Sequence, residues 1–483
     1  MPKQKTIYVA ALILSIVFAT QLTLIQLNIR GILSAEDFSM FIRRRFITLE
    51  FIALCFLYLI WLTQSRPKTP ALRYLELLKP ASLFLIVAWL AHPLTSDIHL
   101  YLQYGLMSLY RINPYLTNAI DFESVVSTFL DWEQSSTYGI ISLAIFAIPA
   151  KFVETNIYLG VYLFKLFCVG FHVLNGFLIW RALRTNVYRH QVTLAYLLSP
   201  VLLFEQVVEA HLDVILCTVL IAIDQLLKTR RYLLALFSAG VGFLLKTLPI
   251  IWIPLIGVFL IRLKRWKTIA KFLVVGGVVI LTLHLTLFPT IESWRSILNP
   301  GVEGMTAGSW HGVLKGILFL TQPPLSSPTQ FAPGSIQAEI LHLYSRLTLL
   351  LFAAYYGFTL YRIYRDRSIL EGQLMIQIGW VTFALFAFAT AWYQPWYATL
   401  LLVIAALNFQ HAPFFAITSF VFSLMGTVAN FCLGYGTGFP GVTAAILTMG
   451  SAIVMLVLRP KIMSHFQAEF PRGIERELQQ TRQ

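Results

Sequence analysis

The chain has 483 residues, of which 58% are hydrophobic and 12% are charged, and its mean hydropathy is +0.73. In a soluble domain about a quarter of the residues are charged, so this composition excludes an ordinary soluble protein and predicts a polytopic membrane protein. The net charge of +14 does not indicate a nucleic-acid partner, because the Lys and Arg residues lie in short clusters between apolar runs, as the positive-inside rule expects.

Apolar runs follow one another along the whole chain, and a run of about 17 to 25 residues is long enough to cross a bilayer. Runs of that length lie near residues 7–28, 46–63, 78–94, 156–180, 192–208, 212–228, 268–288, 341–361, 373–391, 412–430 and 441–458. Shorter runs lie at 232–245, 249–262 and 395–408. We therefore expect an all-α polytopic integral membrane protein of about 14 transmembrane helices, with residues 1–483 forming a single membrane-embedded domain.

The charged segments between the runs set the expected orientation. Basic segments belong in the cytoplasm; they are Arg66 to Lys79, Arg181 to Arg189, Lys228 to Arg231, Lys264 to Lys267, Arg362 to Arg367 and Arg459 to Lys461. The segment from Ser96 to Gln134 carries five acidic residues against Arg111 alone, so it belongs outside. The two longest segments off the membrane, 96–136 and 289–340, fall on that same outer side.

The run from Tyr138 to Lys151 needs a different interpretation. It is short for a span, and if it crossed the membrane the basic segment from Arg181 to Arg189 would be forced outside. The simpler prediction is an outer-face interfacial helix.

Asp97 opens the first outer segment directly after an apolar run. One alternative is a first-turn acid favoured by the helix dipole; the other is a general base near the bilayer surface. Tyr101 and Tyr104 follow at helical spacing, so all three side chains are expected on one face. A polar and aromatic face of this kind suits a sugar-binding wall.

The sequence VVEAHLD places Glu209, His211 and Asp213 between two runs on the outer side. On one helix the two carboxylates, four residues apart, would share a face and repel each other unless a cation or substrate lay between them. The alternative is a polar turn with its hydrogen bonds satisfied. A divalent ion is not indicated, because one imidazole and two carboxylates at this spacing are a weak ligand signature, and the cofactor stays open.

Lys246 lies between two short runs, which puts a cation at the outer end of a helical hairpin, unless it only extends to the interface. The second outer segment adds Arg295. The sequence WYQPWY adds Trp392, Trp396 and Tyr397, whose alternative role is an ordinary aromatic belt. Because ionisable groups at membrane depth normally face a wet cavity, their convergence on the outer side predicts a functional cavity there.

The order of these motifs resembles the GT-C superfamily of membrane glycosyltransferases. It is most similar to the bacterial polyprenyl-phosphate-mannose-dependent mannosyltransferases. The motifs that carry the resemblance are Asp97 before a Tyr-rich helix and Asn113-Pro114-Tyr115, then Tyr138-Gly139, Ser199-Pro200, Glu209 to Asp213, Lys246, and Trp392 to Tyr397. The chain departs from the family where Glu-Ala-His-Leu-Asp replaces an Asn-Gly-His-Asn-Asp-like sequence, so only His211 and Asp213 carry over.

The resemblance implies an inverting transfer of mannose from a polyprenyl-phosphate donor to a glycan or lipid acceptor. Asp97 would be the catalytic base, and the other residues singled out above would bind donor and acceptor, with Lys246 and Arg295 on the donor phosphate. The protein would lie in the cell inner membrane with its site on the periplasmic or extracytoplasmic side. Since nucleotide sugars are normally absent there, a lipid-borne donor fits. The alternatives are a secondary transporter, a lipid-linked glycan flippase, and a polymerase or ligase of surface glycans.

Overall fold

The computed structural model describes residues 2–29, 40–64, 73–130, 134–298, 306–321, 331–434 and 439–469. The regular elements in these ranges are helical, as the sequence predicts. The α-helices are α1 (Pro2–Ile29), α2 (Met40–Gln64), α3 (Tyr74–Leu90), α4 (Asp97–Leu109), α5 (Ile140–Ala150), α6 (Ile157–Ala182), α7 (Arg189–Leu198), α8 (Pro200–Leu202), α9 (Asp213–Lys228), α10 (Tyr232–Leu245), α11 (Trp252–Arg262), α12 (Trp266–Thr286), α13 (Ile291–Leu298), α14 (Trp310–Thr321), α15 (Ile336–Arg365), α16 (Glu371–Ala384), α17 (Thr399–Asn408), α18 (Pro413–Leu433) and α19 (Phe439–Glu469). Short 3-10 or π turns are η1 (Ala119–Asp121), η2 (Ser127–Phe129), η3 (Leu203–Val208), η4 (Leu248–Ile251), η5 (Leu385–Ala389) and η6 (Pro395–Ala398).

Within the described residues, seven stretches are long and apolar enough to cross a membrane. They are Gln4–Gln26, Phe46–Gln64, Ile157–Ala182, Trp266–Thr286, Glu371–Ala389, Pro413–Leu433 and Phe439–Ser464. The other expected spans are largely helical as well, but α3 and α9, with 17 and 16 residues, lie at or just below the short end of the range of about 17 to 25 residues that crosses a bilayer. The larger count of about 14 spans therefore stays a prediction.

The expected span over 192–208 is broken. α7 ends at Leu198, and the pair formed by α7 and the segment Pro200–Val208 is bent by 42°. Pro200 explains the break, because proline has no N–H to donate and pushes the preceding residue out of the α region; Ser199 has ψ 118°. The segment continues as the π-helical turn η3, and turns of this kind are frequent at functional sites.

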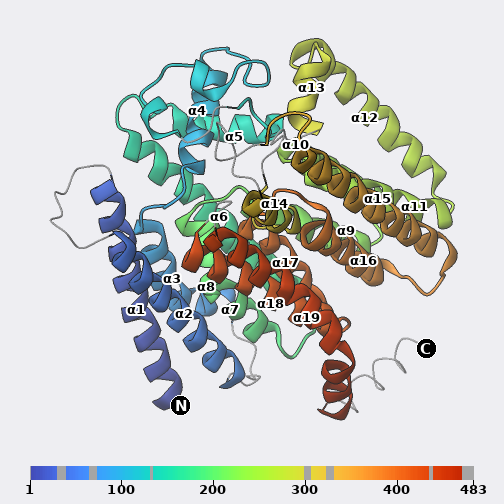
Figure 1. Ribbon diagram of the computed structural model, residues 1–483. Coiled ribbons are helices and arrows are strands. Elements are labelled where there is room, and N and C mark those ends of the chain that lie inside the picture. Colours follow the sequence, from blue (N-terminus) through green and yellow to red (C-terminus); the bar gives the residue numbers. More distant parts are fainter. Residues whose placement is uncertain are drawn as a thin grey trace.

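The first long outer segment and the start of the second lie at one end of the molecule, whereas α14 of the second segment lies near the centre. Figure 1 shows α4, α5 and α13 together at the end opposite the N-terminus. They are joined by contacts: Asn113 donates a hydrogen bond to the Leu287 carbonyl at 2.8 Å, and Phe288 packs on Tyr115 and Trp294. The grouping of these segments on one side agrees with the charge pattern. Asp131, Glu133, Gly301 and Gly304 lie outside the described residues.

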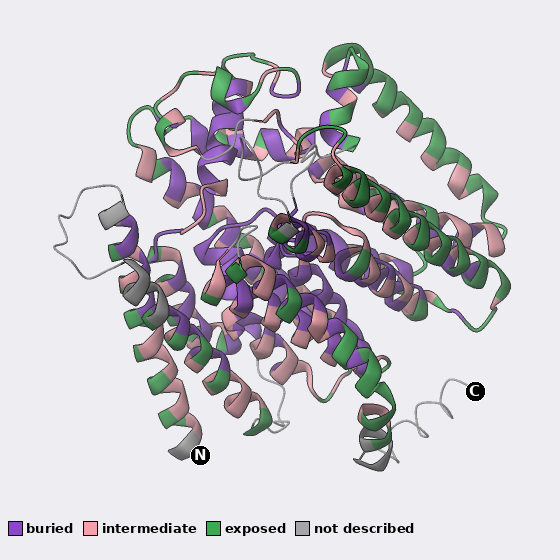
Figure 2. Ribbon diagram, viewed as in Figure 1, coloured by how far each residue is buried: buried purple, intermediate pink, exposed green. Residues whose placement is uncertain are grey.

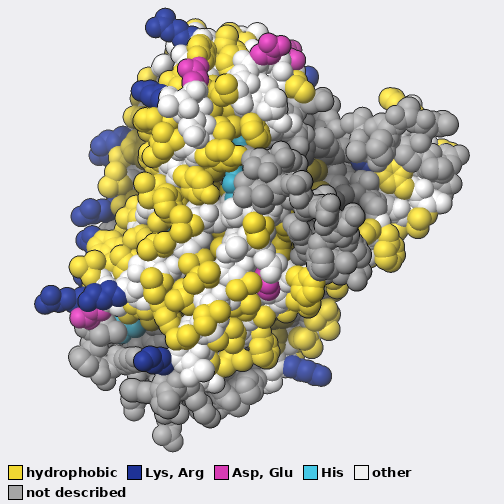
Figure 3. Space-filling model, turned by 90° about the vertical axis from the view of Figure 1, so that its left-hand side faces the viewer, with side chains coloured by type: hydrophobic (Ala, Val, Ile, Leu, Met, Phe, Trp, Pro, Cys, Tyr) yellow, Lys and Arg dark blue, Asp and Glu magenta, His cyan; other side chains and the backbone are white. Residues whose placement is uncertain are grey.

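Different helices form the interior of the protein and its exposed apolar surface. Figure 2 shows α9 buried in the centre, while α12 and α15 are exposed along most of their length. The exposed residues of α12 are largely apolar, such as Leu273, Val274 and Val278. Figure 3 shows one side of the molecule, where hydrophobic side chains are spread over much of the surface that is not drawn in grey. Apolar surface of this extent is what a bilayer would cover.

Candidate active site

His211 lies at the centre of a polar cluster beneath the outer segments. Its Nδ1 is 3.6 Å from Oδ2 of Asp97, and its Nε2 is 3.7 Å from Oε2 of Glu205. The imidazole stacks on the Trp396 ring, with centroids 3.7 Å apart and planes 19° apart. Residues from α4, η3, the turn before α9, and η6 therefore meet at one ring.

The His211 side chain is fully buried, and neither ring nitrogen has a hydrogen-bond partner among the described residues. Burial first, and the nearby Lys246 charge second, lower the pKa of His211 well below its ordinary value. This shift favours the neutral ring, which has one nitrogen as a donor and the other as an acceptor. Buried polar atoms without partners are rare in proteins, so this ring has capacity for a ligand or water.

Lys246 forms the second charged pair of the site. Its ammonium donates to Oδ2 of Asp213 at 2.9 Å. The same nitrogen lies 4.5 Å from the ring centroid of Tyr397 and 5.8 Å from that of Tyr138. Aromatic faces at these distances attract a cation and help to fix its position.

The backbone before α5 brings Tyr138 to Lys246. The two residues form an isolated antiparallel bridge, and the Gly139 N–H donates to the Leu245 carbonyl at 2.9 Å. A Cβ at Gly139 would lie 2.1 Å from the Leu244 carbonyl oxygen, so only glycine permits this approach. Burial first, and the nearby Asp97 charge second, raise the pKa of Tyr138 well above its ordinary value.

The cluster is layered by exposure. The side chains of Asp97 and Lys246 are 14% and 16% exposed, whereas those of His211 and Asp213 behind them are at most 1% exposed. The site therefore presents one carboxylate and one ammonium outward, each supported by a buried partner.

The carboxylates of Glu209 and Asp213 do not share a helical face, which corrects the expectation drawn from their spacing. Glu209 directly follows the turn η3, Ala210 then adopts φ 55°, and Asp213 opens α9. Because the helix is interrupted between them, the two side chains meet different partners. Glu209 accepts hydrogen bonds from the backbone N–H groups of Leu94 and Thr95.

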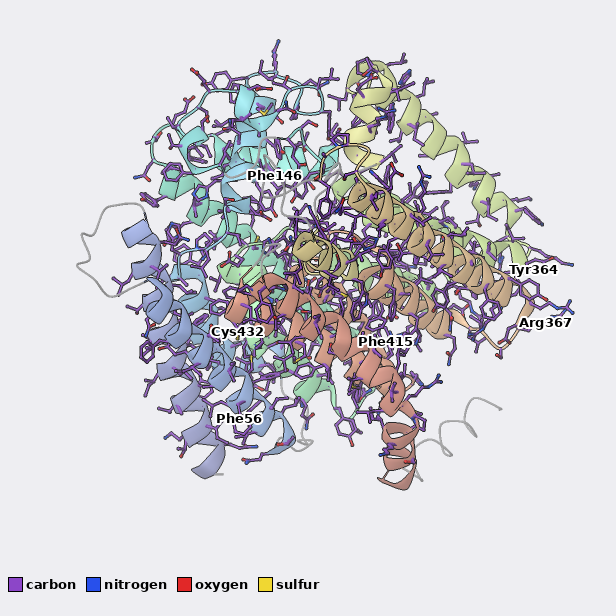
Figure 4. The ribbon with its side chains drawn as sticks, in the orientation of Figure 1. Phe56, Phe146, Tyr364, Arg367, Phe415 and Cys432 are labelled. Carbon is purple, nitrogen blue, oxygen red and sulfur yellow. The ribbon has the colours of Figure 1, made fainter. Side chains whose placement is uncertain are left out.

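Tyr101 and Tyr104 share one face of α4, as expected, and both contact Tyr138. They are buried, and Tyr101 also stacks on Phe146 of α5 with centroids 4.7 Å apart. Figure 4 labels Phe146. The Tyr104 hydroxyl donates to the Gln134 carbonyl at 2.9 Å. In this structure the expected sugar-binding wall is covered by protein, and a role for it in sugar binding stays a prediction.

The remaining predicted residues lie at different distances from the cluster. Trp396 and Tyr397 are in it. Trp392 is next to it, because its backbone bridges to Ala307 and so ties the start of α14 to the aromatic segment. Arg295 is on the exposed side of α13, and no hydrogen bond or ion pair to the cluster is found for it within the described residues.

Glu205 is the residue that the sequence reasoning missed. It is 2% exposed, accepts a hydrogen bond from the Thr427 hydroxyl at 2.8 Å, and faces His211. Its signal was a single carboxylate inside the apolar run SPVLLFEQVV, and such a residue is a functional candidate by default. Among the described residues, no group of three or more His, Cys, Asp and Glu side chains is arranged to hold a metal ion.

The site combines a partly exposed carboxylate, a partly exposed ammonium and a buried imidazole that lies between two carboxyl groups. In an all-helical membrane protein, these groups are typical of a membrane-embedded enzyme. Its family follows from comparison with known proteins. The family model described as alpha-(1->6)-mannopyranosyltransferase, N-terminal domain, matches residues 6–262. The chain belongs to this family and is a glycosyltransferase that moves mannose.

The matched part ends with α11 and contains Asp97, Glu205, His211, Asp213 and Lys246. Trp396 lies beyond it. No curated protein and no solved structure matches the chain.

Proposed function

We propose that the protein is a GT-C-type enzyme that transfers mannose from a polyprenyl-phosphate donor to a glycan or lipid acceptor at the outer face of the membrane. The observation that carries the proposal is the pairing of outward charges: Asp97 supported by His211, and Lys246 supported by Asp213. A displacement at an anomeric carbon needs a base for the acceptor hydroxyl and a cation for the departing phosphate, and these two groups supply them.

Asp97 accepts the proton of the acceptor hydroxyl as its oxygen attacks the anomeric carbon. The bond between that carbon and the phosphate oxygen breaks, and its electron pair leaves with the phosphate. A positioned base of this kind contributes about 10²- to 10⁴-fold in rate. His211, stacked on Trp396, lies behind the Asp97 carboxylate, with its Nδ1 3.6 Å from Oδ2 of Asp97.

Lys246 stabilises the charge that develops on the leaving phosphate. A fixed cation in a site that excludes water acts more strongly than one in solution, because the local dielectric is low. Asp213 and the rings of Tyr138 and Tyr397 hold the ammonium in place before the donor arrives.

The stereochemistry of the product constrains the donor. The family description specifies an α linkage to position 6, and a single displacement inverts the anomeric carbon. The proposal therefore requires a β-linked mannosyl phosphate as donor and a primary hydroxyl as acceptor.

The outer-face location is supported by charge. The segments that carry Asp97 and α13 lie at one end of the molecule and hold few basic residues, whereas the clusters expected in the cytoplasm follow other helices. A donor carried by a lipid reaches such a site from within the bilayer, along the apolar surface of the helices.

The test is transfer of radiolabelled mannose from a β-mannosyl polyprenyl phosphate to endogenous glycan or lipid in membranes that contain the full chain or its Asp97→Asn variant. We expect Asp97→Asn to lower transfer by about 10²- to 10⁴-fold at equal levels of folded protein. The α-linked donor is the matched control and is expected to be inert.

Two results would reject the proposal. The first is transfer by the Asp97→Asn variant at the rate of the wild-type protein. The second is the absence of transfer by the wild-type protein from the β-linked lipid donor.

A further inference from the structure

We propose that Lys165 and Glu209 are positioning residues that fix the connection between α3 and α4 and thereby the place of the Asp97 carboxylate. This inference rests on the proposed function, because it assigns a purpose to the support of the catalytic base. The connection, residues 91–96, is short and ends at the residue before Asp97. Its conformation therefore sets where the base lies.

Lys165 and Glu209 form hydrogen bonds with the same stretch of backbone, one with its carbonyl groups and the other with its N–H groups. Lys165, fully buried on α6, donates to the Ala88 carbonyl at 3.2 Å and to the Ala91 carbonyl. Glu209, 1% exposed at the end of η3, accepts from the Leu94 N–H at 2.9 Å and from the Thr95 N–H at 2.9 Å. The Lys165 ammonium thus donates to carbonyl groups at the end of α3, and the Glu209 carboxylate accepts from the backbone N–H groups that follow.

Helix α1 completes the support from a third side. The His92 N–H donates to the Thr23 hydroxyl oxygen at 3.1 Å, and the Gln26 amide donates to the Leu94 carbonyl at 3.0 Å. Side chains from α1, α6 and η3 therefore hold one connection. We infer that α1, which lies almost wholly within the family-matched residues 6–262, serves in part to hold this connection.

A buried ammonium and a buried carboxylate are costly to keep in a membrane protein, and such residues are normally functional. A base must lie within hydrogen-bond reach of its proton, and a displacement of about 1 Å can cost 10²-fold in rate. Within the described residues, the side chains of Glu209 and Lys165 form no hydrogen bond with the His211 ring or with the carboxylates around it. They act through the backbone, on geometry.

The experiment measures kcat and donor KM of the purified full-length protein in nanodiscs, with radiolabelled β-mannosyl polyprenyl phosphate as donor. Glu209→Gln and Lys165→Met each remove one side of the support. We expect each to lower kcat by about 10- to 100-fold and to change donor KM by less than about twofold, because Lys246 is untouched. Glu209→Asp, which keeps the carboxylate, is expected to recover part of the loss.

Tyr74→Phe is the matched control. The Tyr74 hydroxyl donates to the Val173 carbonyl at 2.6 Å, so it links the same helices, α3 and α6, away from the connection. We expect it to lower the melting temperature but not kcat. Gln26→Leu, matched by Tyr8→Phe, which breaks the link of Tyr8 to the Pro80 carbonyl, repeats the comparison on α1 if a charge variant fails to fold.

The inference is overturned if Glu209→Gln and Gln26→Leu keep the wild-type kcat, or if Tyr74→Phe lowers kcat as much as they do. Failure of the proposed function looks different, because Asp97→Asn would then transfer mannose as the wild type does. Loss in Asp97→Asn with full activity in the support variants would reject only the positioning role.

Discussion

Two parts of one short turn, Glu209 on one side and His211 with Asp213 on the other, are equally buried and yet differ in their hydrogen bonds. Glu209 accepts N–H groups with both oxygens. His211 has no hydrogen-bond partner within the described residues, and Asp213 uses one oxygen for Lys246 while the other has none. Within this turn, burial does not distinguish Glu209 from His211 and Asp213, whereas unfilled hydrogen-bonding capacity does.

The largest expected effect of this difference is at the Lys246–Asp213 pair. Lys246→Met is expected to lower kcat by about 10²- to 10³-fold, because a fixed charge on the leaving phosphate is lost. It also leaves Asp213 buried and unpaired, which costs about 3 kcal/mol or more of unfolding free energy. Transfer assays and denaturant titration in detergent measure the two effects.

The double variant Lys246→Met with Asp213→Asn separates them. We expect it to regain most of the stability and none of the rate, because the buried carboxylate is gone while the phosphate still lacks its cation. Recovery of rate together with stability would show that the Lys246–Asp213 pair only stabilises the fold.

A smaller effect is expected at Glu205, which faces His211 from behind. Glu205→Gln keeps the shape and the contact with Thr427 but removes the titratable carboxyl group, and we expect kcat to fall by about 10-fold since proton transfer at the base is perturbed. Steady-state kinetics across pH 5.5 to 8.5 are the measurement.

Asp224→Asn is the control for Glu205→Gln. Asp224 is also a buried carboxylate, but it pairs with Lys228 at the far end of α9. An equal loss of rate in both variants would mean that replacing any buried carboxyl group lowers the rate. The difference between Glu209 and its neighbours His211 and Asp213 would then not identify the groups that act in the reaction.

The smallest effect is expected at Ala210, which joins the two parts of the turn at φ 55°. An L-residue in this conformation is strained by about 1–2 kcal/mol, so Ala210→Gly is expected to raise the unfolding free energy by at most about 1 kcal/mol after the entropy of glycine is counted. Transfer should be unchanged. A thermal melt in detergent checks this, and Ala210→Val is expected to shift the melt in the opposite direction.

The sequence alone was informative about the classes of residue at the site. Asp97, His211, Asp213 and Lys246 were all found as polar groups between apolar runs, and Trp396 and Tyr397 as aromatics beside them. It was less informative about Glu205, because one carboxylate did not interrupt the apolar pattern of its run. It also placed Glu209 with the binding residues, since spacing alone treats it like Asp213.

The sequence by itself determined the membrane class, the helical elements and the side-chain chemistry, because hydropathy and charge act locally along the chain. Only the tertiary structure decided which polar groups meet. Asp97 and His211 are 114 residues apart, so that no local pattern specifies their contact. The helix break at Pro200 and the positive φ of Ala210 turned Glu209 toward the backbone and His211 toward Asp97, and that division depends on packing among α3, α4, α6 and η3.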